Sequence, residues 1–224
     1  AIRARDAMGW EFANTLGLTE CMCVSIVRAG SDERVRDTTS GTFLKYIEGK
    51  VVDEDGRELP PGEVGELCCR GPSVISGYFI AAGVIEERLD AEGWLRTGDM
   101  ASLDEDGNLS VVARKKEVVI RGGYNIYPEE LEHILMEHAG VGDCAVIGLP
   151  DEVLGEKVCA CVVPGEGNIP ALEELVAHCR NSGVADYKKP DVLHVIEQVP
   201  RTPVGKIQRV ILRDEVVKTL SKGS

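Results

Sequence analysis

Short apolar runs separated by an acidic residue followed by glycine fill the first half of the chain, and they limit most strongly how it can fold. The pairs Asp55-Gly56, Glu92-Gly93 and Asp106-Gly107 are typical of tight turns between strands. The runs between them, for example 64–70 and 108–113, have the composition of short strands. The sequence therefore predicts a β-rich unit over residues 1–114.

Residues 115–224 alternate strand and helix patterns instead. Helices are expected to begin at Pro128 and Pro170, because proline suits the first turn and apolar residues recur at helical spacing after each. Gly183 is expected to end the second helix. The other expected elements are strands at 118–121, 144–149, 158–163 and 192–196 and a helix at the C-terminal end. This pattern predicts a small α+β domain over 115–224.

The charge of the chain excludes some functions. Its 224 residues carry a formal net charge of -13, which argues against binding to nucleic-acid phosphates or to an anionic membrane surface. The apolar stretches are far shorter than the roughly 18 residues that a membrane span requires. We therefore expect a cytoplasmic protein that neither binds nucleic acid nor spans a membrane.

The eight cysteines do not have the spacing of a metal site. No Cys-x-x-Cys occurs, and the four histidines fall at no usual ligand interval. Cys68, Cys159 and Cys161 lie inside apolar runs, where a free thiol behaves as a small hydrophobic group. We expect buried free thiols.

Two clusters in the first half have residues suited to chemistry. Residues 16–20 (Leu-Gly-Leu-Thr-Glu) place Thr19 and Glu20 after an apolar stretch from Trp10 to Leu16, which could be a strand. Residues 93–99 place Asp99 at a glycine-bounded turn. There its carboxylate could accept two ribose hydroxyls or simply cap the turn.

Two further clusters lie at and after the junction between the halves. Residues 114–125 combine a basic run, a strand and Gly122-Gly123, which would either let another molecule approach the backbone or form an ordinary hairpin turn. Residues 200–209 place Lys206 after a glycine, but the rest of a Walker A phosphate loop is missing. Taken alone, Lys206 could be a solvated lysine.

Together and in this order, the clusters resemble motifs of the AMP-forming adenylating superfamily, which includes acyl-CoA synthetases, luciferases and peptide-synthetase adenylation domains. The resemblance runs over nearly the whole chain. The matching stretches are 16–20, 58–67 with Arg70-Gly-Pro and Gly77-Tyr78, 93–99, 114–132 and 200–206. Members are usually more than twice as long. The resemblance therefore implies an α+β fold in which 1–114 is the end of a large N-terminal domain with a distorted β-barrel, and 115–224 is the small C-terminal domain.

The resemblance also implies a reaction. ATP and a carboxylic acid, of fatty or aryl type, give an acyl-adenylate, and coenzyme A then displaces AMP. Residue by residue, it implies that Thr19 contacts phosphate, Glu20 helps to hold Mg²⁺, and Lys206 bridges the acyl carboxylate and the nucleotide. The remaining implied roles are ribose binding by Asp99 and Arg114, cofactor binding at Gly122 and Gly123, and a hinge at Lys116.

Several alternatives remain at this stage. The acyl group could be loaded onto a carrier protein rather than onto CoA. The chain could instead be a binding or regulatory module, with a lysine acetyltransferase and deacetylase acting on Lys206, or a structural domain that binds no nucleotide. Because the upstream half of such enzymes supplies the phosphate loop, we expect the 224-residue chain alone to be inactive.

Overall fold

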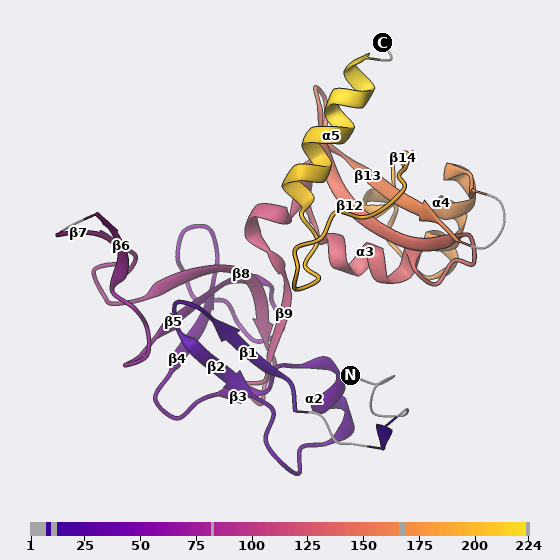
Figure 1. Cartoon of the computed structure of the whole chain (residues 1–224). Helices are drawn as coiled ribbons and strands as arrows, with labels where there is room; N and C mark the ends of the chain where they lie inside the picture. Colours follow the sequence, from indigo (N-terminus) through magenta and orange to yellow (C-terminus); the bar gives the residue numbers. More distant parts are fainter. Residues whose placement is uncertain (1–7, 10–12, 82, 166–168, 223–224) are drawn as a thin grey trace. The chain divides into compact units, whose positions relative to one another are not determined.

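The computed structural model describes residues 8–9, 13–81, 83–165 and 169–222 (Figure 1). The chain divides into two compact units, Ala1–Lys115 and Lys116–Ser224. Strands and helices are mixed as the sequence predicts, with the strands concentrated in the first unit. The assignment of the units to domains of a larger enzyme, including the distorted barrel, stays a prediction.

The regular structure described in the first unit is mostly antiparallel strand, arranged as two sheets and a hairpin. One sheet has the order β1-β2-β3, the other has the order β4-β5-β8-β9, and β6 pairs only with β7. The bounds are β1 Thr15–Leu18, β2 Met22–Ile26, α2 Glu33–Thr38, β3 Thr42–Phe43, β4 Glu48–Val52, β5 Gly65–Arg70, β6 Gly77–Ala81, β7 Val84–Glu87, β8 Leu95–Leu103 and β9 Leu109–Arg114.

The expected turns lie between these strands. Asp104 holds the turn between β8 and β9, because its Oδ1 accepts the backbone N–H groups of Asp106 and Asn108 at 3.1 and 2.8 Å. Both sheets contribute to one core, so they pack on each other. The buried members of this core are Leu18, Cys21, Val24, Ile47, Val51, Leu67, Cys69, Leu95, Ala101 and Leu109.

The strand expected over residues 10–16 is confirmed only at its end. Residues 10–12 lie outside the described residues, and β1 begins at Thr15. Asn14 lies just before β1, and its side-chain amide donates hydrogen bonds to the carbonyl groups of Arg36 and Thr39 at the end of α2.

In the second unit, a sheet is covered by helices on both faces (Figure 1). Its central strand, β13, pairs antiparallel with β12 and parallel with β14. The bounds are β10 Val119–Arg121, β11 Tyr124–Ile126, α3 Pro128–Leu135, β12 Val141–Asp151, β13 Gly155–Pro164, α4 Leu172–Asn181, η2 Asp186–Lys188, β14 Val192–Val195 and α5 Arg209–Lys222. The expected strands and helices of this half are present, and α3 begins at Pro128 as predicted. The helix expected to begin at Pro170 begins two residues later, at Leu172, because Ala171 is its N-cap.

Alternate residues of β12 and β13 bury opposite faces of the sheet. On one face, Val146 and Ala160 pack against Leu135 of α3 and Leu175 of α4. On the other face lie Ala145, Ile147, Cys159 and Cys161, covered by Leu212 and Val216 of α5. Burial on both sides explains why these strands read as continuous apolar runs.

The cysteines are all free thiols, and seven are buried while Cys23 is half-buried. Burial raises the pKa of the Cys144 thiol to about 12, so this group stays protonated and unreactive at neutral pH. The prediction of buried thiols is thus confirmed except at Cys23.

Candidate functional site

The loop between β1 and β2 carries Thr19, which is exposed, and Glu20, which is half-buried. A second segment fixes this loop. The backbone N–H of Ile75 donates to the carbonyl of Glu20 at 2.8 Å, and the hydroxyl of Tyr78 donates to Oε1 of Glu20. The carboxylate is therefore held in place by the start of β6.

The surroundings of Glu20 favour its charged form. The hydrogen bond from Tyr78 lowers the pKa of the Glu20 carboxyl below its ordinary value, and the positive charges of Arg114 and Arg88 act in the same direction against a smaller effect of burial. Glu20 is therefore ionised at neutral pH, as a metal ligand must be.

Asp99 and Arg114 face each other across two paired strands. They are register partners on β8 and β9, and Nε of Arg114 lies 2.9 Å from Oδ1 of Asp99. Asp99 is only 3% exposed, whereas the Arg114 side chain is 42% exposed. A buried carboxylate is thus held by a cation whose other nitrogen atoms are within reach of a ligand.

Asp99 does not lie at a turn, so the expectation that it could cap one is wrong. It lies within β8, where its backbone N–H donates to the hydroxyl of Thr97 at 3.1 Å. The nearby turn is capped by Asp90, whose Oδ1 accepts the N–H groups of Glu92 and Trp94. The ribose alternative for Asp99 remains.

Gly122 and Gly123 form the two-residue turn between β10 and β11. Their φ angles are +57° and +84°, and two consecutive positive values define a turn that strongly favours glycine. The N–H of Gly122 donates to the carbonyl of Leu154 at 2.8 Å, and both residues are exposed. The local structure is thus the hairpin turn, with open backbone around it.

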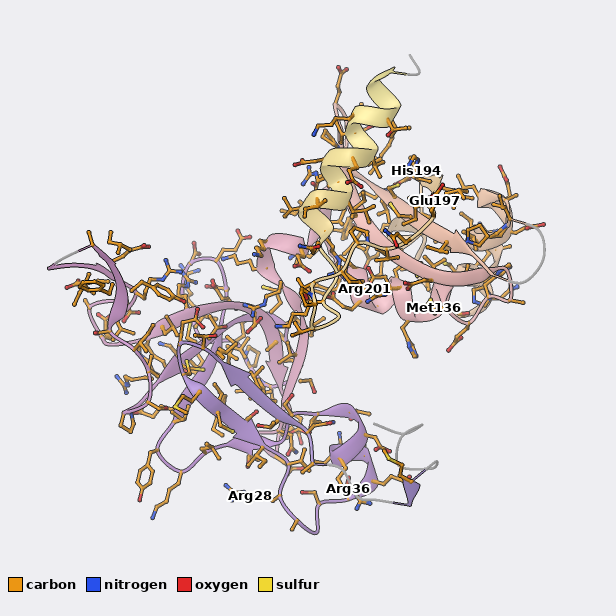
Figure 2. All side chains as sticks on the ribbon, viewed as in Figure 1. Arg28, Arg36, Met136, His194, Glu197 and Arg201 are labelled. Atoms are coloured by element: carbon orange, nitrogen blue, oxygen red, sulfur yellow. The ribbon has the colours of Figure 1, made fainter. Side chains whose placement is uncertain are left out.

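Lys206 lies on an exposed loop that directly precedes α5. Thr202 closes this loop, because its N–H donates to the carbonyl of Lys206 at 2.8 Å and its hydroxyl accepts the N–H of Lys206 at 3.1 Å. Arg201, labelled in Figure 2, anchors the start of the loop through both carboxylate oxygens of Asp143 at 2.8 and 3.0 Å. The backbone around Lys206 is therefore ordered while its side chain is exposed.

Lys116 is the middle residue of a 3₁₀ turn, η1, which spans Lys115–Glu117. The division between the two units falls immediately before it. Its side chain is exposed and forms no hydrogen bond or ion pair with any residue that the structure describes.

The predicted residues gather in the first unit more than in the second. Arg114 pairs with Asp99 and acts electrostatically on Glu20, and Thr19 is next to Glu20 in the same loop. In the second unit, the two-glycine turn, Lys116 and Lys206 occupy three separate elements. No hydrogen bond or ion pair joins these three across the described residues.

Two residues, Tyr78 and Arg209, lie beside predicted site residues in the structure, although the sequence assigned them no role of their own. Tyr78 was recognised only as part of a motif, although its hydroxyl holds Glu20. Arg209 ends the stretch that contains Lys206, and its side chain is only 10% exposed and ion-paired with Glu117 and Glu132 at 2.5 and 2.8 Å. These partners are 92 and 77 positions away, so only the position of Arg209 at the start of a predicted helix could have drawn attention to it.

A metal cage built from protein side chains does not occur in the described part of the chain, where no three His, Cys, Asp or Glu residues are grouped suitably. No helix among these residues has both the length and the apolar character needed to cross a lipid bilayer.

Comparison with known proteins gives consistent matches to one family. Residues 1–79 match the AMP-binding enzyme family, and residues 130–206 match the AMP-binding enzyme C-terminal domain. Among curated proteins, 4-coumarate–CoA ligase-like 9 of Oryza sativa subsp. japonica is 40% identical over 96% of this chain and 40% of its own length. The medium-chain fatty-acid–CoA ligase of Escherichia coli K12 is 42% identical over 82% of this chain and 33% of its own length. The chain thus spans at most two fifths of these relatives.

A solved structure agrees with these matches. The o-succinylbenzoate CoA synthetase of Bacillus subtilis, in complex with the acyl-adenylate intermediate OSB-AMP, has a TM-score of 0.80 and 31% identity to this chain. The match covers 95% of this chain and 43% of that structure.

Proposed function

The chain belongs to the family of AMP-binding enzymes, and on this premise we propose that the complete protein is an acid–CoA ligase. In the first step, a carboxylate oxygen of the acid attacks the α-phosphorus of ATP, and the bond from phosphorus to pyrophosphate breaks. In the second step, the thiol sulfur of coenzyme A attacks the carbonyl carbon and loses its proton, and the bond from that carbon to AMP breaks. The products are an acyl thioester, AMP and pyrophosphate.

The pair of Asp99 and Arg114 carries this proposal. Two ribose hydroxyls need a carboxylate acceptor that is fixed in place, and the Arg114 Nε contact at 2.9 Å provides this. The Arg114 side chain remains 42% exposed, so it can also contact a bound ligand. We assign ribose binding to Asp99 and Arg114.

Mg²⁺ fits the residues next to this pair. Mg²⁺ is usually bound by one or two carboxylates together with substrate phosphates, so a cage of protein ligands is not needed. Glu20 supplies one ionised carboxylate, held by Tyr78, and the exposed hydroxyl of Thr19 can donate to a phosphate oxygen. The metal would neutralise phosphate charge.

The second unit would supply the remaining groups. The ammonium of Lys206 is a mobile point charge on an ordered loop, suited to stabilising the negative charge that develops as the carboxylate attacks phosphorus. The open turn at Gly122 and Gly123 lets a cofactor approach the backbone closely. Lys116 would be the hinge through which this unit changes its pose between the two steps.

The thiol acceptor has two candidates. The relatives and the solved structure described above are CoA ligases or a CoA synthetase, which favours CoA over a carrier protein. A regulatory role remains compatible with this reaction, because acetylation would remove the charge of the exposed Lys206, and a lysine acetyltransferase and deacetylase would then be partners. The cytoplasmic location stays a prediction.

The proposal is tested on the complete purified protein with a panel of fatty and aryl acids. Acid-dependent exchange of pyrophosphate into ATP should appear with at least one acid, and adding CoA should yield the acyl thioester and AMP. Supplying a phosphopantetheinyl carrier protein in place of CoA separates the two acceptors. Absence of exchange with every acid, in a protein that is folded, would refute the adenylating function.

A further inference from the structure

The boundary between the two units lies inside the three-residue turn η1, and both neighbours of Lys116 are ion-paired. Nζ of Lys115 lies 2.9 Å from Oε2 of Glu66, in the first unit. The carboxylate of Glu117 lies 2.5 Å from Nη1 of Arg209, in the second unit. The first and last residues of the turn are thus tied to different units.

The anchor for Lys115 is rigid. Glu66 lies on β5, which is paired on both sides in the sheet β4-β5-β8-β9. Its side chain is only 8% exposed, and its Oε2 also accepts a charge-assisted contact from Nε of Arg96 at 3.0 Å. Two cations on a buried carboxylate fix its position, so Lys115 is tied to the middle of a sheet.

The anchor for Glu117, Arg209, is also largely buried, with a side chain that is 10% exposed. Arg209 is the first residue of α5, and its Nη2 reaches Oε2 of Glu132 on α3 at 2.8 Å. Oε1 of Glu132 in turn accepts the N–H of Val146 in β12 at 2.7 Å. One guanidinium therefore joins the turn to a helix on each face of the sheet.

We propose that Glu66 and Arg209 are positioning residues that confine the rotation between the two units to the backbone of Lys116. With Lys115 held by one unit and Glu117 by the other, the dihedral angles at Lys116 are left to absorb the change, as in hinges made of very few residues. Because Arg209 lies three residues after Lys206, the rotation carries the Lys206 loop as part of a rigid unit. This inference rests on the proposed function, which requires two poses.

The test breaks each pair at the turn and leaves the anchors intact. In the complete protein, Lys115→Gln leaves Glu66 paired with Arg96, and Glu117→Gln leaves Arg209 paired with Glu132. Matched controls break ion pairs away from the turn: Glu48→Gln loses its pair with Arg70 in the first unit, and Glu130→Gln loses its pair with Lys188 in the second. Lys115→Arg is the conservative variant, because arginine can still pair with Glu66.

Two quantities are measured for each variant. Amide hydrogen exchange of peptides covering 114–119 should rise about tenfold in Glu117→Gln and about threefold in Lys115→Gln, since loss of a charge-assisted contact lowers the cost of local opening. The ratio of the adenylation rate to the thioester-forming rate should shift about threefold or more in both. The control variants and Lys115→Arg should match the wild type in both quantities, with exchange elsewhere in the chain unchanged.

Unchanged exchange at 114–119 in both variants would overturn the inference. A rise in exchange with an unchanged ratio of the two rates would also overturn it, because the pairs would then stabilise the turn without directing the rotation. If the complete protein formed no acyl-adenylate, the proposed function would be wrong. The amide hydrogen exchange of 114–119 would still decide whether the two ion pairs restrain the turn.

Discussion

Replacing Asp99 by alanine should weaken the use of ATP far more than the use of CoA. The carboxylate is 3% exposed and held at 2.9 Å by Arg114, so its oxygen atoms need no reorganisation to accept ribose hydroxyls. A hydrogen bond to a charged group contributes about 1.5–3 kcal/mol. At about 1.4 kcal/mol for each factor of ten, kcat/KM for ATP should fall by about 10- to 150-fold.

The same substitution should affect folding less than it affects ATP use. Arg114 loses its partner but is 42% exposed, so water can solvate the guanidinium, and Nη1 keeps its hydrogen bond to the carbonyl of Thr97 at 3.4 Å. We expect a loss of about 1 kcal/mol in the free energy of unfolding. Asp104→Ala is the matched control, because Asp104 holds a turn of the same sheet and should lower stability without changing kcat/KM for ATP.

The assay measures initial rates of the complete protein against ATP and against CoA separately, with thermal unfolding of each variant alongside. Asp99→Asn should fall between the wild type and Asp99→Ala, because the amide keeps one acceptor oxygen and loses the charge. If Asp99→Ala stays folded and its kcat/KM for ATP lies within about twofold of the wild type, Asp99 is a structural residue of β8 and the ribose assignment is wrong.

Other predictions address the remaining residues and the chain as a whole. Lys206→Ala should slow acyl-adenylate formation by about 10² or more and should spare thioester formation from supplied acyl-adenylate, and acetylation of Lys206 should have the same effect. If acyl-adenylate still forms at the wild-type rate, Lys206 takes no part in the reaction. Lys116→Pro fixes φ near -65° and should impair one half-reaction much more than the other, whereas equal loss of both would indicate misfolding. The isolated 224-residue chain should show no acid-dependent pyrophosphate exchange, and measurable exchange would contradict its need for an upstream phosphate loop. The pKa of the Asp151 carboxyl is lowered to about 2 by hydrogen bonds from Lys157 and from the N–H groups of residues 153 and 154. The contribution of Asp151 to the free energy of unfolding is therefore present above about pH 4 and is lost as pH falls toward 2. The difference in unfolding midpoint between wild type and Asp151→Asn should therefore shrink over that range, and a constant difference would show that the charge of Asp151 does not stabilise the fold.

The sequence predicted the elements of the second unit well because their signals are local. Pro128 marks the start of α3, and β12 and β13 contain the apolar runs 144–149 and 158–163 because both faces of their sheet are covered there. Asp99 was harder to place, since the preceding Gly93 and Gly98 suggested a turn, whereas pairing with β9 keeps the residue inside a strand.

The charged partners of the site could not be predicted. Apart from its position at the start of a predicted helix, nothing local in the sequence distinguishes Arg209 from the other arginines. Its ion pairs are with Glu132 and Glu117, which the fold brings from far along the chain. The same holds for Tyr78 and Glu20, which lie 58 positions apart. Motif positions were therefore visible in the sequence, while the contacts that orient them were set by tertiary structure.

Because α5 covers one face of the sheet, the position of Lys206 just before α5 also has a consequence for the stability of truncated chains. Leu212 and Val216 shield Ile147 and Cys161, and the loop that carries Lys206 immediately precedes them. A polypeptide whose synthesis stopped before this loop would lack the lysine, and because α5 follows the loop it would also expose this apolar face to solvent. Such an exposed face is the kind of surface that leads to aggregation and removal by cellular quality control. An incomplete enzyme that could bind ATP without using it would thus be eliminated because it is unstable.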